Sequence, residues 1–265
     1  MLTYPDIDPI IFQLGPLAVR WYGMMYVLGF IATYFLVRYQ FRRYPHPGLE
    51  RNFDNLNLVL IASLILGSRL GYVVFYNFSY YFAHPLEIFA TWQGGMSFHG
   101  GLIGLLFGGW LFCRYSGLPF LRTADAYMVV APIGLGLGRL GNFINGELYG
   151  RVSEVPWAMV FPGGGPLPRH PSQLYESGLE GLVLFIIMWL ALGRYWRQGW
   201  PAGSLAALFL MGYGVMRFLV EFFREPDAQL GLYLNLFSMG QALSALMVVT
   251  GLTLWFALRR RSRLC

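Results

Sequence analysis

The sequence predicts an all-α fold: a polytopic membrane protein of about seven transmembrane helices. Apolar residues make up 56% of the 265 residues and charged residues 12%, whereas a soluble domain carries about 25% charged residues. Long apolar runs accompany this scarcity of charge, as in proteins that cross a bilayer. We therefore expect a single membrane-embedded domain over residues 1–265.

Seven apolar stretches are each long enough to span about 30 Å of hydrocarbon at about 1.5 Å per residue. They lie near residues 18–38, 56–76, 98–114, 125–145, 174–194, 203–223 and 237–258. Glycines interrupt the fourth stretch, and a polar turn begins the fifth. The sequence shows no convincing internal repeat, so the inverted-repeat plan of many transporters has no support.

The arginines predict the orientation, because cytoplasmic loops carry an excess of basic residues. All 19 basic residues are arginine. Alternate loops and the tail hold most of them, namely Arg38, Arg42, Arg43, Arg51, Arg114, Arg122, Arg194, Arg197, Arg259, Arg260, Arg261 and Arg263. An odd number of spans then places the N-terminus outside (periplasmic) and the C-terminus in the cytoplasm. The net charge of +6 is thus a topology signal and indicates no nucleic-acid partner.

Two outside segments are predicted to be structured, near residues 77–97 and 146–173. The first is rich in aromatic residues and lacks arginine, which is typical of an interfacial or re-entrant piece. The second is rich in glycine and proline from residue 150 onward, which indicates a surface loop.

Charged side chains inside the predicted spans indicate a functional site, because charge in a bilayer is costly. Arg69, Arg139, Arg217 and Glu221 fall in the later parts of helices that run from inside to outside. Tyr22 and His99 lie near the outer starts of two others. We therefore expect these groups at similar depth, in the outer half of the bilayer.

The densest candidate is the run from Gly138 to Gly150. It combines a basic side chain, two amides and an acid, namely Arg139, Asn142, Asn145 and Glu147. The alternative is tight helix packing through glycines such as Gly134 and Gly138, which leaves the polar residues unexplained. The match of residues 136–141 to G-x-G-x-x-G is a false lead, because a dinucleotide fold needs a preceding strand.

A second candidate lies on the sixth predicted helix, where Tyr213, Arg217, Glu221 and Arg224 share one face at spacings of four, four and three. An Arg217–Glu221 pair that neutralises itself is the simpler interpretation, and it leaves room for a role in ligand binding. For Arg224, near the interface, the simpler interpretation is snorkelling to the membrane surface.

His99 is the third candidate, because flanking glycines at a helix start leave it accessible. Its reference pKa near 6.5 suits a general base toward a thiol, although a lone histidine is more often structural. The four histidines show no metal-ligand spacing, and the absence of lysine excludes a P-loop or a Schiff-base cofactor. We expect neither metal nor cofactor. Ser172 and Glu176 resemble a capping box, and Glu176 is also a candidate to line the outer site.

Together these motifs resemble the prolipoprotein diacylglyceryl transferase family of bacteria. The family pattern G-R-x-G-N-F-x-N-x-E-x-x-G matches at Gly138–Gly150, and Y-G-x-x-R-F-x-x-E-F-x-R matches at Tyr213–Arg224. H-G-G-L stands at His99–Leu102 and R-H-P-S-Q-L-Y-E at Arg169–Glu176. The resemblance covers essentially the whole chain.

The resemblance implies an enzyme of the bacterial inner membrane, with its active site toward the periplasm. It would move the diacylglyceryl group of phosphatidylglycerol onto the lipobox cysteine of a preprolipoprotein signal peptide, forming a thioether and releasing glycerol 1-phosphate. By resemblance, the phospholipid is bound by Arg139, Asn142, Glu147, Gly150 and Tyr22. The catalytic set is His99, Arg139, Arg217, Tyr213 and Glu221, with Asn145, Glu176, Arg224 and Arg69 in support.

The residues themselves fit such a reaction. Arg139 and Arg217 in a low-dielectric pocket suit a phosphodiester anion, through bidentate contacts and through stabilisation of the charge that develops on the leaving group. The chain has no cysteine on the outer side, so the thiol must come from the partner. A transporter or flippase for anionic lipids is the main alternative, and a scaffold whose charges merely pair is another.

Overall fold

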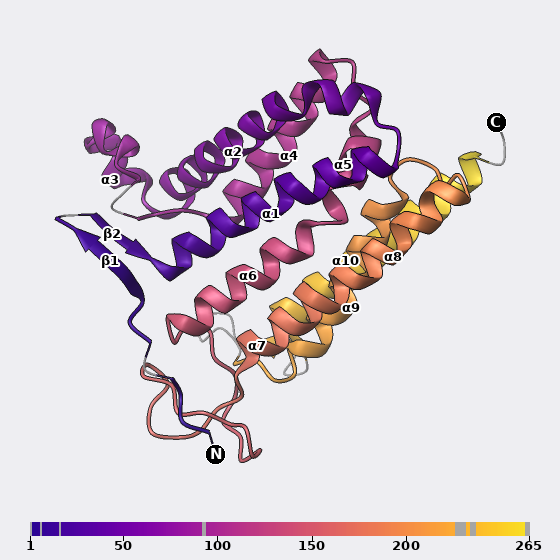
Figure 1. The fold of residues 1–265 in the computed structure, drawn as a ribbon. Coiled ribbons are helices and arrows are strands. Elements are labelled where there is room, and N and C mark those ends of the chain that lie inside the picture. Colours follow the sequence, from indigo (N-terminus) through magenta and orange to yellow (C-terminus); the bar gives the residue numbers. More distant parts are fainter. Residues whose placement is uncertain are drawn as a thin grey trace. The chain divides into compact units, whose positions relative to one another are not determined.

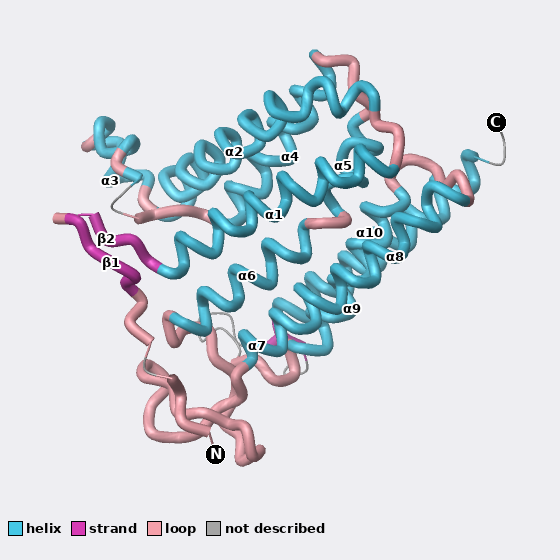
Figure 2. The backbone as a smooth tube through the Cα atoms, viewed as in Figure 1, coloured by secondary structure: helices cyan, strands magenta, loops and turns pink. Residues whose placement is uncertain are grey.

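The computed structural model is mostly helical and describes residues 2–5, 7–15, 17–91, 94–225, 232–233 and 237–262 (Figures 1 and 2). Arg263, one of the arginines used for orientation, lies outside this set, as do residues 92–93 of the first outside segment. The chain forms two compact units. The first comprises Met1–Arg42 with Ala124–Cys265, and the second comprises Arg43–Thr123.

The first unit opens with a β-hairpin that the all-α prediction missed. Strands β1 (Ile10–Leu14) and β2 (Leu17–Arg20) pair antiparallel, with Leu14 opposite Leu17. Gly15 in the turn has φ +58°, a left-handed conformation that glycine adopts without strain. Helix α1 (Trp21–Arg43) follows directly, so the first predicted span begins three residues later than residue 18 and continues to Arg43.

The fourth predicted span is a bent pair of helices, α5 (Phe120–Met128) and α6 (Ala131–Ile144), which meet at 46°. The glycines noted in this span lie inside α6 and do not break it. The break falls just before Pro132 in the first turn of α6. Proline has no amide hydrogen and its ring clashes with the preceding turn, so it tolerates only the start of a helix.

The rest of the first unit is a bundle of long helices. The chain runs from α7 (Ser172–Glu176) through the π-helix η3 (Ser177–Val183) into α8 (Leu184–Arg197). It continues with α9 (Ser204–Val220), the short paired strands β3 (Leu232–Tyr233) and β4 (Phe237–Ser238), and α10 (Met239–Ser262). Helices α8, α9 and α10 run side by side (Figure 1). The polar turn expected before the fifth span is present as α7.

The second unit is built on α2 (Pro47–Tyr76) and α4 (Phe98–Tyr115), with α3 (Phe78–Ala83) and the 3-10 helix η1 (Pro85–Phe89) between them. Glycines let the two long helices approach closely. A Cβ on Gly67 would clash with the carbonyl oxygen of Gly100, and a Cβ on Gly100 would clash with that of Gly67. Packing therefore explains these glycines of α4, which the sequence analysis had interpreted as open space around His99.

The pattern of exposure is that of a protein that faces lipid. Apolar side chains such as Leu66, Phe75 and Phe256 are exposed, whereas Glu176 and Glu180 are completely buried. Over the described residues, three helices are long and apolar enough to cross a membrane, or four if the bent pair is one span. These are Gly48–Tyr76, Ser172–Arg197 and Met239–Arg261, with Phe120–Met128 and Ala131–Ile144 as the pair. The chain is an integral membrane protein.

Candidate functional site

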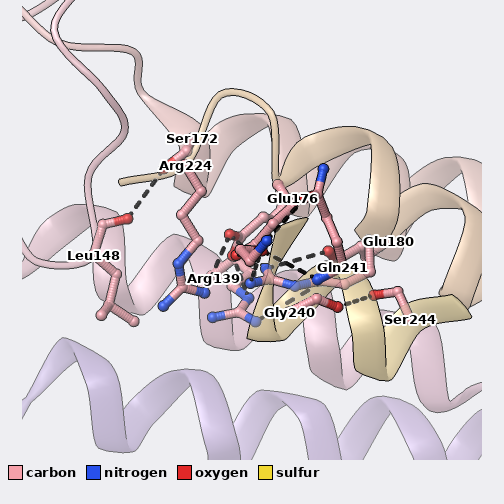
Figure 3. Close-up of polar contacts among 12 residues, drawn as sticks. Arg139, Leu148, Ser172, Glu176, Glu180, Arg224, Gly240, Gln241 and Ser244 are labelled. Carbon is pink, nitrogen blue, oxygen red and sulfur yellow. Dashed lines mark hydrogen bonds and ion pairs between the residues drawn. The ribbon is translucent and has the colours of Figure 1, made fainter. Parts of the chain in front are cut away.

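Six charged side chains of the first unit gather in one place, which we call the ion cluster (Figure 3). Helix α6 contributes an arginine, α7 and η3 each contribute a glutamate, and α9 with the turn after it contributes the rest. The members are Arg139, Glu176, Glu180, Arg217, Glu221 and Arg224. Of the groups that the sequence analysis expected at similar depth, Arg139, Arg217 and Glu221 lie together in this cluster.

Glu176 is the centre of the ion cluster. Its Oε2 lies 2.6 Å from Nε of Arg139, and its Oε1 lies 2.8 Å from Nη1 of Arg217 and 3.7 Å from Nη1 of Arg224. The carboxylate is completely buried. A buried charge needs charged partners and hydrogen bonds to be stable; here three guanidinium groups pair with the carboxylate, and Arg217 donates a hydrogen bond to it.

Arg217 is held from two sides. Its Nη1 donates to Glu176, and its Nη2 donates to Oε2 of Glu221 at 2.6 Å. Glu221 in turn accepts a hydrogen bond from the hydroxyl of Ser238 at 2.9 Å. The backbone of Gly240 presses against the same carboxylate, since a Cβ there would lie 2.6 Å from Cδ of Glu221. The predicted Arg217–Glu221 pair therefore exists and belongs to a larger network.

The snorkelling interpretation of Arg224 was wrong. Its guanidinium turns inward toward Glu176 and its side chain is only 13% exposed. Its backbone carbonyl accepts a hydrogen bond from Nε of Arg151 at 2.9 Å. Arg224 thus belongs to the ion cluster, where the buried carboxylate of Glu176 is its charged partner.

Two glycines bring α6 against η3. A Cβ on Gly136 would lie 3.0 Å from Cα of Gly181, and a Cβ on Gly181 would lie 2.7 Å from Cα of Gly136. This contact places Arg139, one turn further along α6, beside Glu176 and Glu180. The packing interpretation named Gly134 and Gly138, but an added Cβ at either would meet no described atom within 4 Å; the close contact is made by Gly136 instead.

The loop after α6 is organised around Glu147. Its Oε1 accepts hydrogen bonds from the amides of Asn142 at 2.9 Å and Asn145 at 3.0 Å. Its backbone carbonyl accepts a third from Nε2 of the buried Gln173 at 2.6 Å. Leu148 has φ +57°, an uncommon conformation for a residue with a Cβ. The amides of the predicted run thus orient the glutamate, whose side chain remains exposed.

The predicted capping box was wrong. Ser172 lies inside the first turn of α7, and its hydroxyl donates to the carbonyl oxygen of Leu148 at 3.1 Å (Figure 3). Glu176 pairs with arginines instead of returning to the helix start. The alternative interpretation, that Glu176 belongs to the site, describes the structure.

Gly150 is fixed in a crowded position. Its amide donates to the carbonyl of His170 at 2.8 Å, and an added Cβ would clash with the carbonyl of Phe223. His170 interacts through Nδ1 with the hydroxyl of Tyr175 at 3.1 Å, and burial lowers the pKa of its imidazole. Gly150 thereby ties the Glu147 loop to the segment that precedes α7.

Tyr22 of α1 packs against α6. A Cβ on Gly141 would lie 2.9 Å from the ring of Tyr22, so this glycine admits the aromatic side chain. The hydroxyl of Tyr22 lies 3.1 Å from that of Tyr26, and it interacts electrostatically with Glu147 and Arg139. Tyr213 of α9 stacks on Phe209 and interacts electrostatically with Glu180 and Arg217. Both predicted tyrosines therefore lie near the ion cluster.

His99 and Arg69 lie in the second unit. His99 is exposed at the start of α4, where the hydroxyl of Ser97 caps the helix by accepting from the amide of Gly100 at 3.2 Å. Arg69 is buried, and its guanidinium donates to five backbone carbonyls. These belong to Glu87, Ile88, Ala90, Gly94 and Gly95. Arg69 thus anchors the segment that leads into α4 and His99.

The sequence analysis missed two buried carboxylates. Glu180 lies four residues after Glu176 within the fifth span, where its charge alone was a sufficient signal. Asp125 in α5 accepts hydrogen bonds from the amides of Gly203 at 2.7 Å and Ala206 at 2.9 Å, and so caps α9 from a distance. Among the described residues, no group of three or more His, Cys, Asp and Glu side chains is placed to hold a metal ion.

Comparison with known proteins extends over almost the entire chain. The family model described as prolipoprotein diacylglyceryl transferase matches residues 9–257. The phosphatidylglycerol–prolipoprotein diacylglyceryl transferase of Desulfotalea psychrophila is 61% identical over 256 residues, which cover 96% of this chain and 94% of the relative. The proteins of the same name from Geobacter sulfurreducens and Vibrio vulnificus are 56% and 52% identical, covering 98% and 96% of this chain and 98% and 92% of the relatives.

Proposed function

The chain belongs to the prolipoprotein diacylglyceryl transferase family, and from this premise we propose that it modifies a preprolipoprotein signal peptide with a lipid. The chain is a transferase of lipoprotein biosynthesis. Its substrates are phosphatidylglycerol and the lipobox cysteine of the signal peptide. The sulfur of the cysteine forms a bond to the glycerol carbon of the diacylglyceryl group, the bond from that carbon to the phosphate oxygen breaks, and glycerol 1-phosphate leaves.

Arg139 is the group that binds the phosphate. Its side chain is 21% exposed, compared with 11% for Arg217 and 13% for Arg224. It contacts Glu176 through Nε, and its Nη2 lies 4.0 Å from Glu180, beyond hydrogen-bond distance, so its terminal nitrogens are available to a ligand. Guanidinium groups suit phosphate oxygens because their donors are planar and paired. This combination of accessibility and fixed orientation is the single observation that carries the proposal.

Arg217 supports the reaction through its contacts with the glutamates of the ion cluster. Both of its terminal nitrogens contact carboxylates, on Glu176 and Glu221, so it stabilises the developing charge through the ion cluster and keeps Glu176 in place. The prediction that Arg217 itself grips the phosphate stays a prediction. Charges fixed before the reaction stabilise a leaving group without reorganisation.

The Glu147 loop binds the glycerol part of the headgroup. The exposed carboxylate of Glu147 is oriented by Asn142 and Asn145, and it can accept hydrogen bonds from the hydroxyls of the glycerol headgroup. Gly150 holds the loop in its conformation, and Tyr22 borders α6 on the same unit. This assignment follows the resemblance residue by residue.

His99 is the base that takes the proton of the thiol. Its exposure at the start of α4 allows a peptide thiol to reach it, and an imidazole is a suitable acceptor near neutral pH. Arg69 positions the segment before it. Tyr213 remains a proposed member of the catalytic set, beside Glu180 and Arg217.

We place the chain in the bacterial inner membrane with seven spanning helices. The apolar helices α1, α4 and α9 would complete the set begun by the three long spans and the bent pair. The arginine distribution places the N-terminus in the periplasm and the C-terminus in the cytoplasm, with the ion cluster toward the periplasmic side. Residues 1–265 then act as a single catalytic domain, which stays a prediction.

The test is transfer of radiolabelled glycerol lipid to a lipobox peptide in purified enzyme. Arg139→Ala is expected to lower the rate by at least about 100-fold, the usual loss when one donor to a developing anion is removed. Arg38→Ala, which removes an exposed arginine that donates a hydrogen bond to the hydroxyl of Tyr34, is the matched control. Unchanged turnover in Arg139→Ala would refute the phosphate role. Lipid movement across a vesicle without label on the peptide would favour a flippase.

A further inference from the structure

Glu180 stands apart from the other acids of the ion cluster. Both of its oxygens are buried, and neither accepts a hydrogen bond from any described residue. It has no arginine nitrogen closer than 3.6 Å: Oε1 lies 3.6 Å from Nη1 of Arg217, and Oε2 lies 4.0 Å from Nη2 of Arg139. By contrast, Glu176 and Glu221 each have an arginine nitrogen at 2.6 Å. Glu180 is therefore the carboxylate least stabilised as an anion.

The charges of the ion cluster are balanced before any substrate arrives. Its three arginines face three glutamates within a buried region. A phosphodiester bound at Arg139 adds one negative charge to this balanced set. In a low-dielectric environment an uncompensated charge is strongly disfavoured, so the cluster must either gain a positive charge or lose a negative one.

A proton taken up by Glu180 is the simplest way to compensate the negative charge of the bound phosphodiester, as the groups that face Glu180 indicate. Arg139 approaches from α6, Glu176 from α7, and Arg217 with Tyr213 from α9. Arg224 interacts from the turn after α9. The arginines are already protonated and cannot gain charge. The widened turn of the π-helix η3 directs Glu180 to this position, and such turns are common at functional sites.

We propose that Glu180 is a charge-balancing residue, which takes up one proton when the anionic headgroup binds at Arg139 and releases it when glycerol 1-phosphate leaves. This inference rests on the proposed function. It explains why Glu180, a weakly paired acid, lies beside Arg139 and Arg217, two arginines that the proposed function assigns to an anionic substrate. Phosphatidylglycerol affinity should therefore depend on pH through Glu180, and the dependence should be reciprocal, because proton and lipid binding are linked.

The test measures proton uptake directly. Calorimetric titration of micellar phosphatidylglycerol into the solubilised protein, in Hepes and in Tris, reports protons exchanged from the difference in buffer ionisation heats. Wild type is expected to take up close to one proton per lipid over the pH range in which Glu180 is ionised without lipid. Its Kd should rise by up to tenfold per pH unit there. Zero uptake at every pH from 5 to 9 would overturn the proposal.

Variants separate this linkage from a structural role. Glu180→Gln keeps the shape of the side chain but cannot take up a proton. The Kd of this variant for phosphatidylglycerol should therefore lose the pH dependence seen in wild type. At pH 9 the variant should bind the lipid at least tenfold more tightly than wild type does. Asp125→Asn, another buried acid changed to its amide, should keep the wild-type slope. A wild-type slope in Glu180→Gln would refute the proposal. If Glu180→Gln does not fold, proton uptake by wild type still decides.

Two further arms keep the inference distinct from the proposed function. Phosphatidylcholine carries no net charge and should cause no proton uptake; uptake equal to that with phosphatidylglycerol would overturn the proposal. Transfer to the lipobox peptide is measured on the same preparations. Transfer without proton uptake would leave the function intact and remove the role of Glu180, whereas proton uptake without transfer would do the reverse.

Discussion

Substituting Gly240 by alanine should disrupt the ion cluster without changing any charge. The added Cβ would lie 2.6 Å from Cδ and Oε1 of Glu221 and 2.7 Å from Oε2. Ordinary contact requires about 3.4 Å or more, so the carboxylate must retreat by roughly 0.8 Å. That displacement would stretch its 2.6 Å contact with Nη2 of Arg217 and its 2.9 Å hydrogen bond from Ser238.

The magnitude follows from the two effects together. Overpacking costs about 1–3 kcal/mol, and a weakened hydrogen bond to a charged group costs about 1.5–3 kcal/mol. A loss of roughly 3–5 kcal/mol corresponds to a fall in melting temperature on the order of 10 °C for a chain of this size. Because Glu221 helps to hold Arg217, transfer activity should fall as well.

Thermal unfolding in detergent, combined with the transfer assay, measures both consequences. Gly178→Ala is the matched control, because an added Cβ there meets no described atom within 4 Å. It should leave the melting temperature unchanged or slightly higher, since alanine restricts the unfolded chain. A Gly240→Ala protein with the melting temperature and activity of wild type would refute the view that Gly240 supports the cluster.

Three other perturbations test the scaffold around the site. Asp125→Ala removes the acceptor of two amides at the start of α9 and should lower the free energy of unfolding by about 1–3 kcal/mol, with Asp125→Asn retaining part of it. Arg69→Ala should loosen the segment before His99, so proteolysis after residue 87 should increase; a protection pattern equal to wild type would contradict this. Acidification should destabilise the second unit through His46, because burial and the nearby Arg122 lower the pKa of His46 from 6.5 to about 4.

The sign of the His46 effect is fixed by proton binding. Between pH 6.5 and 4 the unfolded chain binds a proton at His46 and the folded chain does not, so the free energy of unfolding decreases as pH falls through this window. The full loss would be about 3 kcal/mol, at 1.36 kcal/mol per pH unit. Melting temperatures at pH 7.5 and 5 should show the change. His46→Gln should reduce it, whereas His84→Gln, at an exposed position, should retain it.

The sequence predicted the helices well because apolar runs in a membrane protein are long and leave few alternatives. All seven expected stretches are helical over most of their length. The β-hairpin before Trp21 was missed because its pairing depends on a turn at Gly15 that short apolar strands do not signal. The bend before Pro132 was not predicted, although proline is the residue that a helix interior cannot accept.

The sequence predicted the arginines Arg139 and Arg217 and named Glu176 and Glu221 as candidates, but it missed Glu180 and the pairing of Glu176 with the arginines. Charge inside a bilayer is costly, which pointed to Arg139 and Arg217. Spacing along one helix pairs residues that are four apart, so it identified only Glu221 as a partner of Arg217. Glu176 and Glu180 come from another helix, and their contacts depend on the approach of Gly136 to Gly181. Such a contact between distant segments cannot be deduced from local spacing.

The central claim is that Arg139 binds the phosphate of a lipid while the glutamates hold it in place. The most direct measurement is an experimental structure of the protein with bound phosphatidylglycerol, in which the distance from the phosphate oxygens to the terminal nitrogens of Arg139 is determined. We expect about 2.7–2.9 Å, the usual length of a charge-assisted hydrogen bond. A headgroup bound elsewhere, with no phosphate oxygen within hydrogen-bond reach of Arg139, would contradict the claim.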